Sequence, residues 1–130
     1  MKKKISIISI CVILIGTLSA LLLFKGNKPF KDLKANDIVS AQVEISPPNK
    51  TVQITNIVEL VPYLNDLVIY RKDQIPNLAG QAVIVTLKMV DGEQIEIIDF
   101  NTFVVINGVG YKSKYEPDEA LSRYANNLLY

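Results

Sequence analysis

The chain has 130 residues and balances 14 basic residues against 13 acidic ones, with one cysteine and no histidine. The absence of histidine excludes Ser-His-Asp and Cys-His catalysis, and with a single cysteine it also excludes the usual zinc sites and any internal disulfide. From Ala35 onward seven basic residues stand against twelve acidic ones, a net charge of −5 that excludes a nucleic-acid partner, because phosphate binding needs clustered Lys and Arg.

An uncharged apolar run covers residues 5–24, with Lys2, Lys3 and Lys4 before it and Lys25 after it. A helix rises about 1.5 Å per residue, so this run just spans a hydrocarbon core of about 30 Å. It predicts an N-terminal transmembrane anchor over residues 1–24. The alternative is a cleaved secretory signal, with its cleavage site at residues 17–20. The apolar run resumes through residue 24, however, as a stop-transfer helix requires.

We expect the N-terminus inside the cell and the C-terminal domain outside, because a short tail with three lysines is easily retained in the cytoplasm. A cytoplasmic domain is the alternative, since four lysines (Lys25, Lys28, Lys31 and Lys34) follow the apolar run. Cys11 lies in the middle of the run without the small residues that precede a lipoprotein cysteine, so we expect it to face lipid.

Residues 25–36 are rich in lysine and contain Gly26 and Pro29, which indicates a basic tether. Phe30 and Leu33 are the apolar residues of this tether that we expect to dock on the following domain. Residues 37–130 are enough for a single domain with a modest hydrophobic core.

The domain begins with a predicted β-hairpin. Apolar and polar residues alternate over 41–45 and 51–55, and the Pro-Pro-Asn-Lys sequence between them is typical of a turn. A helix follows, with Asn56 as N-cap and Glu59 at the capping-box position. Its apolar face comprises Ile57, Leu60, Val61 and Leu64. Pro62 should kink or shorten this helix.

Residues 67–72 look extended, and a long strand rich in β-branched residues covers 81–90. Asp91-Gly92 predicts a hairpin into a strand at 93–100, and Asn107-Gly108 predicts a hairpin between 103–106 and 109–112. The last four of these strands, from 81–90 to 109–112, form a predicted four-stranded meander. One face of the long strand carries Val83, Val85, Leu87 and Met89.

The chain ends in a predicted helix. Pro117 suits its first turn, Asp118 and Glu119 favour its positive end, and its buried stripe comprises Leu121, Tyr124, Ala125 and Leu128. The expected fold class is α+β: an N-terminal transmembrane helix, then a single antiparallel-sheet domain built as ββα, a β-meander and a C-terminal α-helix.

Four segments, Pro-Phe-Lys-Asp-Leu at 29–33, Leu-Asn-Asp-Leu-Val-Ile-Tyr at 64–70, Gly-Gln-Ala-Val-Ile at 80–84 and Ile-Asn-Gly-Val-Gly-Tyr-Lys at 106–112, carry a resemblance. Residues 29–129 resemble a family of small exported, membrane-anchored domains of unknown function from Firmicutes. The resemblance implies export and a single domain. It implies no activity and supplies no catalytic or binding residue.

Asp91, Glu93, Glu96 and Asp99 are the carboxylates with the closest spacing, within nine residues of one hairpin. We interpret them as a solvated strand face. The alternative is a carboxylate-only hydrolase or a calcium-binding module, although the spacing does not match an EF-hand. Ser113 stands between Lys112 and Lys114, but neighbouring strand residues point to opposite faces, which indicates a hydrophilic strand end.

Five aromatic residues lie on or beside the meander. If they share the uncovered sheet face, they form a surface that binds a peptide, a wall glycan or a partner protein; otherwise they close the edges of the core. These residues are Tyr70, Phe100, Phe103, Tyr111 and Tyr115.

The sequence therefore predicts a non-enzymatic binding module without catalytic residues, metal or cofactor. Its expected partners are the membrane, through residues 5–24, and an unidentified protein or cell-envelope ligand. The alternatives are a cleaved, secreted binding or inhibitor-like domain, and the carboxylate-only hydrolase or calcium-binding module.

Overall fold

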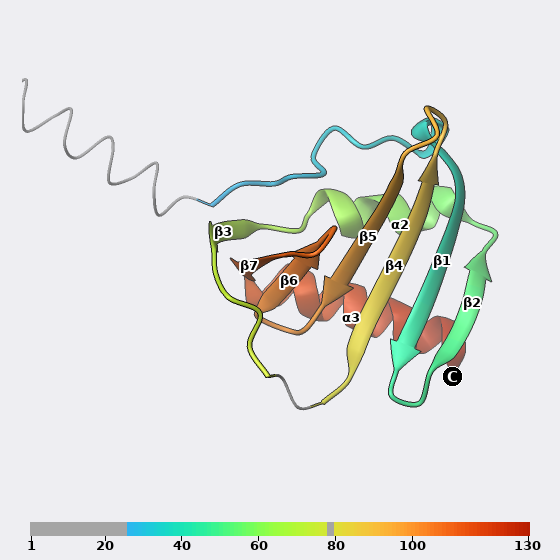
Figure 1. Cartoon of the computed structure of the whole chain (residues 1–130). Coiled ribbons are helices and arrows are strands. Elements are labelled where there is room, and N and C mark those ends of the chain that lie inside the picture. Colours follow the sequence, from blue (N-terminus) through green and yellow to red (C-terminus); the bar gives the residue numbers. More distant parts are fainter. Residues whose placement is uncertain (1–25, 78–79) are drawn as a thin grey trace, which may run out of the picture.

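Seven β-strands form a single antiparallel sheet in the part of the chain that the computed structural model describes, residues 26–77 and 80–130. Two α-helices accompany the sheet (Figure 1). The elements are η1 (Ala35–Asp37), β1 (Ile38–Ser46), β2 (Lys50–Ile54), α2 (Ile57–Asn65), β3 (Ile69–Lys72), β4 (Ala82–Met89), β5 (Gln94–Asp99), β6 (Phe103–Ile106), β7 (Val109–Ser113) and α3 (Tyr115–Leu129). This arrangement confirms the α+β class.

The predicted anchor over residues 5–24 lies outside the described residues. Among the helices of residues 26–77 and 80–130, none has the length and apolarity that crossing a membrane requires.

The strand order is β2-β1-β4-β5-β6-β7-β3. The β1–β2 hairpin, α2 and the four-stranded meander β4–β7 are confirmed. β1 pairs with β4 along its length, from Ile38 opposite Met89 to Ser46 opposite Ala82, and so joins the hairpin to the meander. β3 pairs with β7 at the other edge, although the two strands lie far apart in the sequence.

The tight turns form where the sequence predicts them. Asn107 and Gly108 both have positive φ values, 48° and 84°, as a two-residue turn between β6 and β7 requires. The Asn107 side-chain oxygen also accepts a hydrogen bond from the backbone N–H of Glu96 (2.8 Å), which ties this turn to β5.

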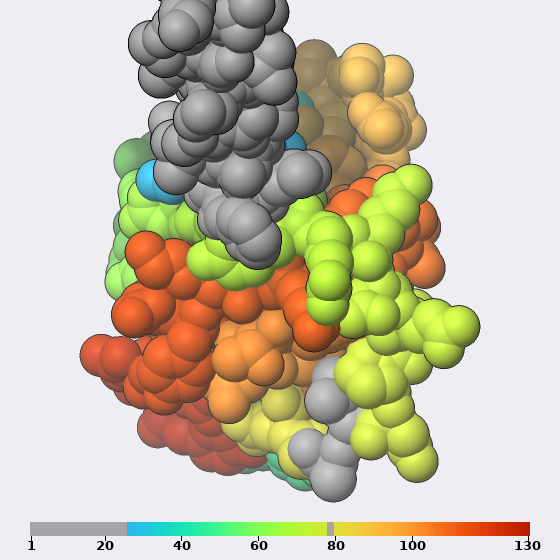
Figure 2. Space-filling view, turned by 90° about the vertical axis from the view of Figure 1, so that its left-hand side faces the viewer, coloured from blue at the N-terminus to red at the C-terminus, as the bar shows by residue number. Residues whose placement is uncertain are grey.

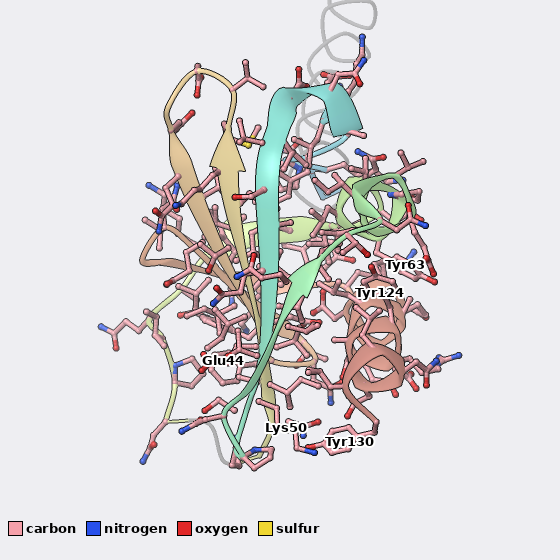
Figure 3. All side chains as sticks on the ribbon, turned by 90° about the vertical axis from the view of Figure 1, so that its right-hand side faces the viewer. Glu44, Lys50, Tyr63, Tyr124 and Tyr130 are labelled. Atoms are coloured by element: carbon pink, nitrogen blue, oxygen red, sulfur yellow. The ribbon has the colours of Figure 1, made fainter. Side chains whose placement is uncertain are left out.

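Both helices cover the same face of the sheet, and the described part of the long connection after β3 lies on the other side (Figure 3). Val83, Val85 and Leu87 of β4 point to the helices and are fully buried. The space-filling view shows residues 70–77, in yellow-green, beside the orange β6 and β7 (Figure 2). The Asp73 N–H donates to the Gly110 carbonyl oxygen (3.0 Å) and so fixes the start of this connection.

Helix α2 has the predicted cap and apolar face. The side-chain oxygen of Asn56 accepts the Glu59 N–H (3.2 Å), and Leu60 and Leu64 are fully buried. Pro62 lies in the exposed part of the helix, which ends three residues later at Asn65.

Helix α3 departs from its predicted stripe at one position. Leu121, Tyr124 and Ala125 are buried as expected, but Leu128 is 41% exposed, so its predicted burial is wrong. Leu129 packs against the core instead, because residues 121, 125 and 129 recur at intervals of four on the face toward the sheet.

The tether is attached to the domain. Asn27 and Ile69 exchange two backbone hydrogen bonds (2.7 and 2.8 Å). Phe30 is buried and Leu33 packs against the core, which confirms that these two side chains dock.

Candidate functional site

The five aromatic residues predicted as a binding surface are distributed over different parts of the domain. Tyr70 on β3 and Tyr115 at the start of α3 are exposed. Phe103 is buried, and the Phe100 N–H donates to its carbonyl oxygen (2.8 Å). Tyr111 lies opposite the fully buried Val104 and packs against the core. The structure therefore joins the backbones of Phe100 and Phe103, and it divides the five residues between exposed and core positions.

The four predicted carboxylates do not converge either. Asp91, Glu93 and Glu96 are exposed, as a solvated face requires. Asp99 is 2% exposed, so its predicted position on that face is wrong. Residues 95, 97 and 99 of β5 alternate with 94, 96 and 98, and the first set points to the helices. In residues 26–77 and 80–130, no three Asp, Glu, Cys or His side chains gather into a metal-binding group.

A groove runs between α2 and α3, and it contains two hollows that share Tyr63 and Ala120 as lining residues. The first hollow has a volume of about 310 Å³. Its other lining residues are Glu59 of α2 and Arg123, Tyr124, Asn127 and Leu128 of α3.

Two stacked tyrosines form the wall of the first hollow. The ring centroids of Tyr63 and Tyr124 are 4.6 Å apart with an interplanar angle of 24°. Figure 3 shows the two labelled side chains next to each other where α2 and α3 meet. Burial raises the pKa of the Tyr124 hydroxyl, and the nearby Glu59 carboxylate and Tyr63 raise it further.

The second hollow lies on the other side of Tyr63 and has a volume of about 330 Å³. Its polar residues carry both signs of charge: Lys28, Asp66, Lys114 and Glu116. Lys28 and Asp66 form an exposed ion pair (4.0 Å). The groove thus offers aromatic surface at its centre, with hydrogen-bond donors and acceptors on both sides.

Behind the first turn of α3, two buried carboxyl groups approach each other. Asp118 has no exposed surface, and its Oδ2 accepts a hydrogen bond from the hydroxyl of Ser113 on β7. Asp99 on β5 accepts the backbone N–H of Asn101 at Oδ1 (3.2 Å). The second oxygen of each carboxyl group, Asp99 Oδ2 and Asp118 Oδ1, is buried without a hydrogen-bond partner.

Both carboxyl groups favour the protonated form. Burial, and then the charge of Asp118, raises the pKa of Asp99 to about 9, while the N–H of Asn101 lowers it. Burial raises the pKa of Asp118 to about 7, and the hydrogen bond from Ser113 lowers it. Two charges in one desolvated site repel each other, so the pair retains a proton where exposed carboxyl groups have lost theirs.

Sequence reasoning missed both the groove and the carboxyl pair. The alternation along β5 assigns Asp99 to the same face as Ile97, which is a usable signal. No comparable signal existed for Tyr63, because its partner Tyr124 lies on another element, 61 residues further along the chain. The burial of Ser113 depends on α3 folding over β7.

Comparison of the chain with protein-family models, with curated proteins and with solved structures finds no match to any of them.

Proposed function

We propose that this chain is a single-pass membrane protein that presents a small acidic domain outside the cell, and that this domain binds a ligand without catalysing a reaction. The uncharged run at residues 5–24, the net charge of −5 after residue 34 and the lack of histidine support this proposal. The resemblance to small exported domains from Firmicutes agrees with it.

The observation that carries the proposal is the groove between α2 and α3. Its two hollows adjoin at Tyr63, and ligand sites in small folds are concave surfaces of this size, built from aromatic side chains and a few polar groups. Helices α2 and α3 both pack on the sheet, so the groove walls are supported by the core.

The lining favours a neutral ligand rich in hydroxyl groups, such as a short saccharide of the cell envelope. Glu59 and Arg123 offer an acceptor and a donor in the first hollow, and Asp66 and Lys114 do so in the second. Such mixed charge selects neither an anion nor a cation, whereas a hydroxyl group both donates and accepts. The tyrosine pair supplies flat apolar surface for the ring of a sugar.

Calorimetric titration of the full chain in detergent micelles with chitotetraose tests this proposal, with an uncharged tetrapeptide titrated in parallel. We expect Tyr63→Ala to weaken binding of the saccharide about tenfold or more, since aromatic contacts dominate small interfaces. Tyr63→Phe should retain most of the affinity because it keeps the ring.

Tyr70→Ala is the matched control, because Tyr70 is an exposed tyrosine that lines neither hollow of the groove. Its affinity should equal that of the wild type. If Tyr70→Ala lowers the affinity for the saccharide and Tyr63→Ala does not, the binding site lies at the exposed aromatic residues and not in the groove. Capture of the tetrapeptide alone, or of neither probe, would overturn the saccharide assignment.

Cell fractionation followed by intact-mass measurement tests the location. Full-length protein in the membrane fraction, trimmed by external protease, is the expected result. A shortened chain that begins near residue 20 and is found in the medium would contradict the anchored protein and support the secreted alternative.

A further inference from the structure

The buried pair formed by Asp99 and Asp118 takes no part in the groove, yet it joins the sheet to the helix that forms one groove wall. Asp99 belongs to β5, Asp118 to the first turn of α3, and Ser113 to β7. Three elements therefore contribute two carboxyl groups and a hydroxyl group to this buried site.

No basic side chain compensates this pair in the described residues. In the sheet, Asp99 lies between Val83 of β4 and Val104 of β6, which carry no charge. Beyond Val104 in the same row is Tyr111 of β7, whose side chain carries no basic group. On α3, the charged group that affects Asp99 is Asp118, which raises the pKa of Asp99. The one side-chain hydrogen bond to Asp118 among the described residues comes from the hydroxyl of Ser113.

The charged residues nearest in sequence to Asp118 do not neutralise it. Glu116 and Glu119 are acids, and Lys114, before the helix, is exposed. The ion pairs of the described residues involve other acids, namely Asp66, Asp73 and Glu119. Two ionised carboxylates here would be desolvated and unpaired, which is strongly unfavourable.

We propose that Asp99 and Asp118 form a proton-operated latch, in which a retained proton keeps the first turn of α3 docked on β5 and β7, and loss of that proton loosens α3 from the sheet. A protonated carboxyl group is uncharged and can donate a hydrogen bond, so one retained proton allows a link between β5 and α3 that two charged groups would not. When both groups are ionised, this link is replaced by repulsion.

The direction of the pH effect follows from the folded-state pKa values. Both carboxyl groups have a pKa in the folded protein, about 9 and about 7, above the ordinary value of 3.8. Their contribution to folding is therefore complete below the ordinary pKa and is lost as the pH rises through the folded values. We therefore expect α3 to be docked on the sheet most firmly at acidic pH.

Opening of α3 would also alter the groove, since Pro117 and Ala120 near the start of the helix line its second hollow. This consequence for ligand binding rests on the proposed function. The latch itself does not rest on that function, and its test requires no ligand.

The experiment measures amide hydrogen exchange of α3 and the thermal unfolding of the full chain in detergent micelles, from about pH 5 to about pH 9. After correction for the intrinsic exchange rate, we expect the opening constant of the first turns of α3 to increase on the order of tenfold over this range. The wild-type Tm should fall over the same range.

Asp99→Asn removes the titrating group and keeps its shape, so its Tm should vary less with pH and exceed that of the wild type at about pH 9. The matched control is Glu96→Gln, which changes an exposed carboxylate on the other face of the same strand. It should follow the wild-type curve. Equal pH dependence in Asp99→Asn and the wild type would overturn the latch.

A second measurement needs no variant. Carbon-13 NMR of the aspartate carboxyl groups should show two resonances, those of Asp99 and Asp118, that titrate well above the ordinary range. If every aspartate of the folded domain titrates near its ordinary pKa, the pair is ionised at neutral pH and no latch exists.

Discussion

Gly110 of β7 lies directly beside the ring of Phe103, which belongs to the neighbouring strand β6. A Cβ atom at this position would meet Phe103 Cζ at 2.7 Å and Cε1 at 2.8 Å, and the carbonyl oxygen of Asp73 at 3.0 Å. The backbone at Gly110 is not in the left-handed region, so close packing rather than φ requires glycine here. One missing side chain thus makes room both for the Phe103 ring and for the connection after β3.

We expect Gly110→Ala to destabilise the domain by about 1–3 kcal/mol, as overpacking usually does. Urea unfolding followed by circular dichroism measures this change. Phe103→Leu in the same chain replaces the ring, which the alanine methyl group would meet, with a smaller side chain. The double variant should therefore lose less stability than the sum of the two single variants. Strict additivity would contradict the proposed clash.

Asp99 is a second case in which one residue depends on its environment. Its charge and spacing resemble those of Glu93 and Glu96, yet strand alternation directs it into the core and toward Asp118. Two acidic residues in one short strand therefore have different environments: Glu96 is exposed, whereas burial raises the pKa of Asp99.

At the scale of the elements, α3 shows how a helix divides its surface between the core and the groove. Leu121 is fully buried toward the sheet, while Leu128 lines the first hollow of the groove. The two leucines differ by seven residues, which is nearly two turns, so a simple periodic pattern assigns them to one face. The exposed position of Leu128 depends on where α2 lies.

Leucine-to-alanine substitutions in α3 separate these two environments. Leu121→Ala should destabilise the domain by about 2–5 kcal/mol, because it leaves a cavity in the core. Leu128→Ala, the matched control, should change stability by no more than about 0.5 kcal/mol, as expected at an exposed site. Thermal or urea unfolding measures both. Equal losses would mean that both leucines belong to the core.

At the scale of the whole molecule, the N-terminal tether is part of the folded unit. The side-chain amide of Asn65, at the end of α2, donates to the carbonyl oxygens of Phe30 (2.6 Å) and Leu33 (3.1 Å). With the backbone bonds between Asn27 and Ile69, these contacts fix the segment that leads toward residue 25.

Asn65→Ala should release the tether while leaving the sheet intact. Removing two hydrogen bonds costs about 1–2 kcal/mol locally, so brief trypsin digestion should cleave at Lys28 or Lys31 roughly tenfold faster. Asn127→Ala, at an exposed position of α3, is the control and should be cleaved at the wild-type rate. Unchanged cleavage of Asn65→Ala would show that the buried Phe30 holds the tether alone.

The sequence by itself determined the local features of this protein. The Asn56 cap, the Asn107-Gly108 turn and the alternation in β4 all follow from short-range patterns. Each depends on residues a few positions apart, whose geometry the backbone fixes directly. The α+β class follows from the order of these elements.

Only the tertiary structure decided which distant residues meet. The pairing of β1 with β4 and of β3 with β7, the stack of Tyr63 on Tyr124 and the approach of Asp99 to Asp118 join residues from separate elements. Such contacts form because burying one helix-covered face selects a single packing of the whole chain. No pattern of spacing within one segment contains that information.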